Sequence, residues 1–156
     1  MNLNSVAQVK LIVRKLNNLC KYLNREYSIN YGGCCYVAYV IAKLLESDDI
    51  KFRLVVYSED EIIENSIEDL YESCNHCSIS LEGDLDLNDD GCKKDSSLER
   101  YEFIAESRDI LKYYKKCDWN PYYDIHLNPF ISKILKISYD NITKNLREGQ
   151  CSYKNS

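Results

Sequence analysis

The chain of 156 residues is 45% apolar and 29% charged, which predicts one folded domain over residues 1–147 and a flexible tail over 148–156. Its net charge of −5 and the absence of a basic tract argue against a nucleic-acid partner. No stretch is long and apolar enough to span a membrane, and residues 1–10 lack the pattern of a signal sequence, so we expect a cytoplasmic protein without a membrane partner.

The first half of the chain opens with apolar residues that recur every three or four positions. This spacing predicts an amphipathic helix over 3–27, capped by Asn2 or Asn4. A break that contains two glycines follows the helix. The later elements predicted in this half are a buried helix over 34–46, a strand over 52–57 and a short helix over 61–71.

A β-hairpin is predicted from strict alternation of apolar and polar residues over 76–88. If the loop consists of Glu82–Asp84, the apolar side chains of both strands lie on the core face. The register pairs Leu81 with Leu85 and Ile79 with Leu87. It places His76 on the opposite face together with Asp86, Asn88 and Asp90.

The last third begins with a polar stretch over 89–97 that contains a glycine and predicts a loop. Apolar residues at helical spacing then predict a helix over 98–116. An irregular link over 117–128 follows, and Pro129 is expected to open a last helix capped by Asn128.

The chain has eight cysteines, which a cytosolic setting would keep reduced and mostly buried as small hydrophobic residues. Cys34 stands out because glycines precede it and a helix is predicted to start there. Unpaired N–H groups and the helix dipole at such a position stabilise a thiolate. Cys35 shares this position, so the local pattern leaves the nucleophile open between the two.

A thiol nucleophile needs an imidazole as its base, and the imidazole needs a polar group to fix its orientation. His76 begins a predicted strand, and Asn88 lies diagonal to it on the adjoining strand. Asp86 and Asp90 compete with Asn88 for the third role. Taken alone, His76 also fits a structural histidine at a strand edge, and His126 is expected to be structural.

Two motifs together carry a family resemblance. The first is Gly-Gly-Cys34-x-Tyr-x-Ala38, which leads into an apolar helix, and the second is His76-x-Ser-Ile-Ser-Leu-x-Gly83 with Asn88 beyond. In their order and intervening elements they resemble the papain-like and transglutaminase-like cysteine hydrolase superfamily, in a small form of the kind found in phages. The resemblance implies an α+β fold with N-terminal helices packed on a small antiparallel sheet.

The same resemblance implies a thiol protease or related amidase acting on a peptide or protein, without a metal or other cofactor. Cys34 would attack an acyl carbonyl, His76 would shuttle the proton and Asn88 would orient His76. The spacing of the superfamily motif favours Cys34 over Cys35 as the nucleophile. The backbone N–H of Cys34 would help to stabilise the oxyanion, and Asn30 is the nearest substitute for the upstream glutamine of papain.

Two other interpretations stay open at the level of sequence. The chain could be a phage binding protein or virion component that keeps the fold without catalysis. It could also be an interaction module stabilised by zinc, because Cys74, His76 and Cys77 have the spacing of metal ligands. Either Cys34–Cys35 or Cys92 could complete such a zinc site.

Overall fold

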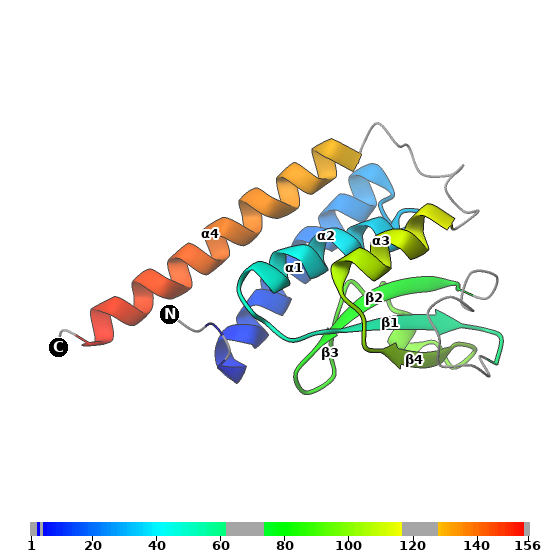
Figure 1. Cartoon of the computed structure of the whole chain (residues 1–156), viewed down its shortest axis with the longest axis horizontal. Helices are drawn as coiled ribbons and strands as arrows, with labels where there is room; N and C mark the ends of the chain where they lie inside the picture. The colour runs from blue at the N-terminus through cyan, green and yellow to red at the C-terminus, as the bar shows by residue number, and fades with distance from the viewer. Residues whose placement is uncertain (1–2, 4, 62–73, 117–127, 155–156) are drawn as a thin grey trace.

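The computed structural model describes residue 3 and residues 5–61, 74–116 and 128–154. Their elements are α1 (Val6–Tyr27), α2 (Cys34–Ser47), β1 (Arg53–Ser58), β2 (His76–Leu81), β3 (Leu85–Leu87), the 3-10 helix η2 (Cys92–Lys94), β4 (Glu99–Phe103), α3 (Ser107–Lys116) and α4 (Asn128–Lys154). The four strands form one antiparallel sheet in the order β3-β2-β1-β4, and the helices gather on one side of it (Figure 1). The predicted α+β class is confirmed, while membership of the papain-like superfamily stays a prediction.

Helix α1 confirms the predicted first helix, but the predicted cap is wrong. The N-cap is Ser5 and neither Asn2 nor Asn4. The Ser5 hydroxyl accepts a hydrogen bond from the main-chain N–H of Gln8, whose side chain accepts one from the N–H of Ser5. This reciprocal capping box satisfies two N–H groups that the helix leaves unpaired, which a single asparagine cap would not do.

Helix α2 is the buried helix that the sequence predicts, and it packs against β2 on one face of the sheet. Its apolar character is explained by burial on several sides, since α3 and α4 also contact it. The side chains that it buries are Cys34, Cys35, Val37, Ala38, Val40, Ile41, Ala42 and Leu45. They join the core with Leu54, Val56, Cys77, Ile79 and Leu81 of the sheet.

The hairpin of β2 and β3 has the predicted register, with Leu81 opposite Leu85 and Ile79 opposite Leu87. Gly83 and Asp84 take positive φ values of 74° and 56° in the loop between the strands, as a three-residue hairpin loop allows. Every residue of β2 is buried, the polar ones included. The alternating pattern predicts one buried face, so the burial of both faces is a result that only the structure provides.

The helix predicted over 98–116 is wrong in its first part, which forms strand β4 along the free side of β1. Arg100 and Glu102 point to one face of β4 and form an ion pair, whereas Phe103 is buried in the core. This period of two suits a strand that completes the hydrogen bonds of β1. Ile104, an apolar residue just after β4, is 95% exposed. The second part of the prediction is correct and forms α3.

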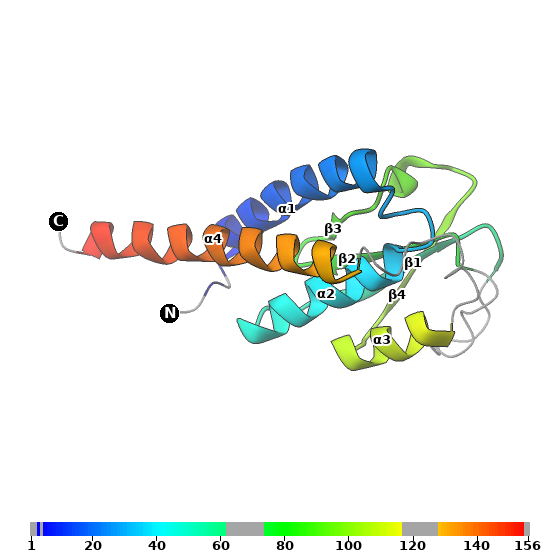
Figure 2. The same ribbon diagram turned by 90° about the horizontal axis from the view of Figure 1, so that it is seen from above.

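Helix α4 lies across α1 and α2, on the side away from the sheet (Figures 1 and 2). It begins at Asn128, one residue before the predicted start at Pro129, and its first turn is held close to the start of α2. The Tyr36 hydroxyl donates to the main-chain oxygen of Asn128 over 3.1 Å, and the Asn128 amide donates to the Tyr114 hydroxyl over 3.2 Å. The sequence predicts a flexible tail over 148–156, because it contains nothing to anchor that segment. In the structure, α4 continues as far as Lys154.

Residues 89–97 form the predicted loop, which contains the short helix η2. All but Glu61 of the predicted helix over 61–71 lies outside the described residues, as do residues 117–127 of the predicted link with His126. Among the helices that the structure describes, none combines the length and apolar character needed to cross a lipid bilayer.

Candidate active site

Cys34 is the first residue of α2, where an α-helix presents N–H groups that have no partner within the helix. Gly32 has a φ of 85°, in the left-handed region that favours glycine, and turns the chain toward the helix. Gly33 immediately precedes α2 and provides no side-chain cap. The positive end of the helix dipole therefore acts at Cys34 without a competing cap, and it favours a thiolate there.

His76 is the first residue of β2, at the end of the sheet where α2 begins. Its Nε2 atom lies 2.6 Å from the main-chain oxygen of Asn88. Because a carbonyl oxygen can only accept a hydrogen bond, Nε2 carries a proton and Nδ1 is the ring atom left for another partner. The ring of Tyr57 lies beside the imidazole, with 6.3 Å between the two centroids. These contacts fix both the tautomer and the position of His76.

After burial, the strongest influence on the pKa of His76 comes from the side chain of Cys34. Burial disfavours the imidazolium, but hydrogen bonding with Cys34, the charge of Cys34 and the Asn88 carbonyl outweigh burial and raise the pKa of His76 to about 9. Hydrogen bonds from Cys35 and Cys77 lower the pKa of Cys34 well below its ordinary value, and His76 lowers it further against the effect of burial. The pair thus favours a thiolate beside an imidazolium.

Asn88 contacts His76 through its backbone and not through its carboxamide. Its side chain forms two hydrogen bonds with the side chain of Asn30, at 3.1 and 2.9 Å, and its N–H donates to Asn17 over 2.7 Å. Asn88 has a φ of 66°, a left-handed conformation that asparagine tolerates better than most residues. Asn17 and Asn30 therefore hold the turn that aims the Asn88 carbonyl at the imidazole.

Asp86 and Asp90, the competitors of Asn88 in the sequence, have their own partners. The Asp86 carboxylate accepts a hydrogen bond from the Tyr57 hydroxyl at 2.5 Å and two from Arg100 at 2.8 and 2.7 Å. Asp90 is exposed and accepts a hydrogen bond from Asn24. Asp86 still supports the site indirectly, because it holds the tyrosine that lies against His76.

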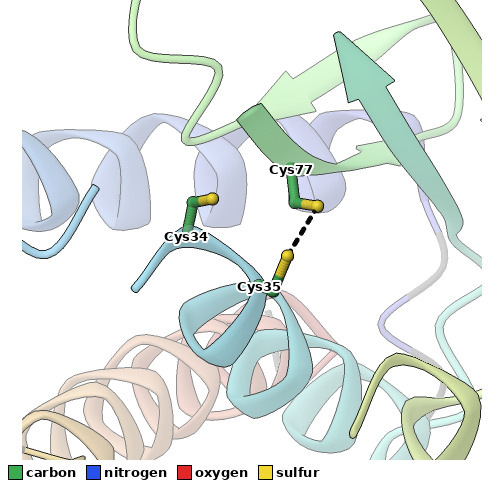
Figure 3. Close-up of side chains that lie close together, drawn as sticks. All are labelled: Cys34, Cys35 and Cys77. Carbon is green, nitrogen blue, oxygen red and sulfur yellow. Dashed lines mark hydrogen bonds between the residues drawn. The ribbon is translucent and has the colours of Figure 1, made fainter. Parts of the chain in front are cut away.

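Three thiols, those of Cys34, Cys35 and Cys77, lie close together, and the Cys74 thiol contacts one of them. The Cys35 and Cys77 sulfurs are 2.8 Å apart, and those of Cys74 and Cys77 are 3.3 Å apart. The sulfurs of Cys34, Cys35 and Cys77 all lie within 4.8 Å of one another, on the facing ends of α2 and β2 (Figure 3). Cys34 keeps 8% of its residue surface exposed, against 4% for Cys35 and none for Cys77, so it is the least buried residue of the three.

The structure thus brings together Cys34, His76 and Asn88, which the sequence singles out, and separates Asp86 and Asp90 from them. Sequence reasoning missed Asn17, which has no signal beyond being a polar residue on an amphipathic helix. It also missed Tyr57 and Arg100, whose roles depend on which strands become neighbours. Among the candidate zinc ligands, Cys74 and Cys77 join Cys34 and Cys35, whereas Cys92 lies outside the group of three sulfurs.

The described surface has pockets at a different place from this cluster. One is lined by Ile50, Phe52, Ser80 and Asp84, at the opposite end of β2 from His76. In comparisons with known proteins, no family model, no curated protein and no solved structure matches this chain.

Proposed function

We propose that this protein is a cysteine hydrolase that cleaves an amide or related acyl bond in a peptide or protein substrate. The observation that carries the proposal is the arrangement of Cys34 at the start of α2 beside His76, whose other ring nitrogen is bonded to the Asn88 carbonyl. A nucleophile, a base and a group that orients the base are the three parts of nucleophilic catalysis by a thiol.

The chemistry follows from the positions of these atoms. The Cys34 thiolate attacks the acyl carbon, and the N–H groups at the start of α2 stabilise the oxyanion that forms. Imidazolium His76 gives its Nδ1 proton to the leaving amine, so that the amide bond breaks and a thioester on Cys34 remains. His76 then takes a proton from water, the resulting hydroxide equivalent attacks the thioester, and the acid leaves with the thiolate restored.

An activated ester tests this proposal without knowledge of the natural substrate. Reduced protein, treated with a chelator, is mixed with p-nitrophenyl acetate while p-nitrophenolate release is followed. We expect a burst in which Cys34 becomes acetylated, then slower turnover as water hydrolyses the thioester. Replacing Cys34→Ala should remove the burst, and His76→Ala should reduce turnover roughly 100-fold or more. Mass spectrometry of the quenched burst identifies the acetylated residue.

Two controls separate chemistry from folding in this experiment. Cys92→Ser removes a half-buried thiol outside the group of three sulfurs and should keep both phases. His76→Gln keeps a donor for the Asn88 carbonyl but cannot act as a base, so it should fold like the parent and lose turnover. Acetyl groups distributed over several cysteines, with turnover unaffected by His76→Gln, would contradict the proposal.

A further inference from the structure

The four clustered thiols exceed what a cysteine nucleophile requires. Cys34 and Cys35 are adjacent in the first turn of α2, while Cys74 and Cys77 lie just before and within β2. Segments about forty residues apart in sequence thus contribute two cysteines each. Cys20, which is buried in α1, and Cys92, which begins η2, lie outside this group. We propose that these four thiols form a binding site for a zinc ion.

The distances among three of the sulfurs suit a tetrahedral thiolate site, and the fourth sulfur contacts one of these three. With a zinc–sulfur bond of about 2.3 Å, the sulfurs of such a site lie about 3.8 Å apart. Those of Cys34, Cys35 and Cys77 lie within 4.8 Å of one another, and Cys74 is 3.3 Å from Cys77. The closest pair, Cys35 and Cys77 at 2.8 Å, would need to move apart by about 1 Å, which rotation of the side chains allows.

The chemistry of the cluster favours a soft divalent ion. Thiolates select zinc and related metals over magnesium or calcium, which prefer oxygen ligands. Neutral thiols are weak donors and weak acceptors, so four of them gain little from contacting one another in the core. The start of α2 adds a positive dipole end that offsets part of the negative charge of a zinc ion with four thiolates. Cys34, Cys35 and Cys77 are buried, as the ligands of closed zinc sites commonly are.

Metal binding and the proposed catalysis share Cys34. A zinc ion held by this sulfur would prevent its attack on an acyl carbon, so the metal-free protein would be the reactive form. This consequence rests on the proposed function, whereas the metal site rests only on the positions of the thiols. The two proposals can therefore fail separately.

Titration with cadmium or cobalt(II) tests the metal site through a signal that does not depend on activity. Protein that has been reduced and freed of metal is titrated with each ion, and thiolate-to-metal charge-transfer absorption is recorded. We expect absorption that saturates at one ion per chain, with cobalt bands typical of tetrahedral thiolate coordination, and zinc should displace the cobalt. Binding should also release protons and raise the melting temperature.

Matched serine variants identify the ligands. Cys77→Ser and Cys74→Ser should each weaken cadmium binding at least tenfold, whereas Cys92→Ser should leave it unchanged. Cys74 is only half-buried, so its variant serves if Cys77→Ser does not fold. Absence of charge-transfer absorption in reduced protein would overturn the site, as would equal binding by Cys74→Ser and the parent. If cadmium binds as expected while p-nitrophenyl acetate gives no burst, only the hydrolase proposal fails.

Discussion

At the scale of single residues, the candidate site depends on how one imidazole is held. Nε2 of His76 is bonded to a backbone carbonyl, and Cys34 is the side chain that most raises the pKa of the imidazole. A carbonyl provides the same tautomer control as a carboxamide, but it depends on the backbone conformation of Asn88 and not on its side chain. The backbone of Asn88 orients His76, so the asparagine side chain is not itself the orienting group. The sequence cannot show which of the two groups orients the imidazole.

Substitution of Asn88 tests this account of its role. Asn88→Gly keeps the carbonyl and readily adopts the positive φ, so p-nitrophenyl acetate turnover should remain within a few-fold of the parent. Asn88→Ile keeps the carbonyl too, but its β-branched side chain disfavours the left-handed conformation, so turnover should fall much further. Both variants lose the bonds to Asn30, which makes them matched in that respect. If Asn88→Gly loses as much turnover as His76→Ala, the Asn88 carboxamide is the group that orients His76.

At the scale of elements, a polar network joins all four strands on the sheet face opposite the helices. Asp86 of β3 contacts Tyr57 of β1 and Arg100 of β4, and Arg100 also donates to Ser80 of β2. The Asp86 side chain is only 2% exposed, so its charge needs these partners. Burial raises the pKa of Asp86, but Arg100, Tyr57 and Ser80 outweigh burial and lower it overall. The network therefore stabilises the ionised carboxylate and holds Tyr57 against His76.

The sign of this pKa shift predicts how stability depends on pH. The pKa of Asp86 is lower in the folded protein than in the unfolded chain, so its stabilising effect is complete above the unfolded value of about 3.9. The effect is lost as the pH falls from that value through the folded one. Asp86→Asn should lower the free energy of unfolding by about 2–3 kcal/mol at pH 7, and the difference from the parent should shrink below about pH 4.

Urea unfolding of both proteins between neutral and acidic pH measures this difference. Glu106→Gln is a suitable control, since it breaks an ion pair with Arg108 in which both side chains are more than half exposed. Its effect on the free energy of unfolding should stay within about 0.5 kcal/mol at every pH. If the difference in the free energy of unfolding between Asp86→Asn and the parent stays constant down to acidic pH, Asp86 does not contribute as a charged group.

At the scale of the whole molecule, local patterns predicted the elements that contain the site, and contacts between distant segments decided the rest. The glycine break, the buried helix after it and the register of the hairpin are all encoded by neighbouring residues, and the structure confirms them. The strand at 99–103 was missed because its pairing with β1 is a long-range contact that competes with local helical spacing.

The residues of the candidate site could be predicted from the sequence, but the contacts between them could not. Cys34, His76 and Asn88 could be proposed because a helix start and a hairpin register fix where they lie. The backbone role of Asn88 could not be predicted, since it depends on bonds to Asn17 and Asn30 in and after α1. The meeting of Cys77 with Cys35 depends on how α2 packs against β2, which no local pattern specifies.

The measurement that tests the central claim most directly is the alkylation of native, reduced, metal-free protein with iodoacetamide at neutral pH, with each modified cysteine identified by mass spectrometry. We predict that Cys34 reacts before Cys35, Cys74, Cys77 and Cys92, and that His76→Ala slows its reaction roughly tenfold or more. Slow labelling that spreads over the exposed thiols, with Cys34 protected and His76→Ala without effect, would contradict an activated nucleophile at the start of α2.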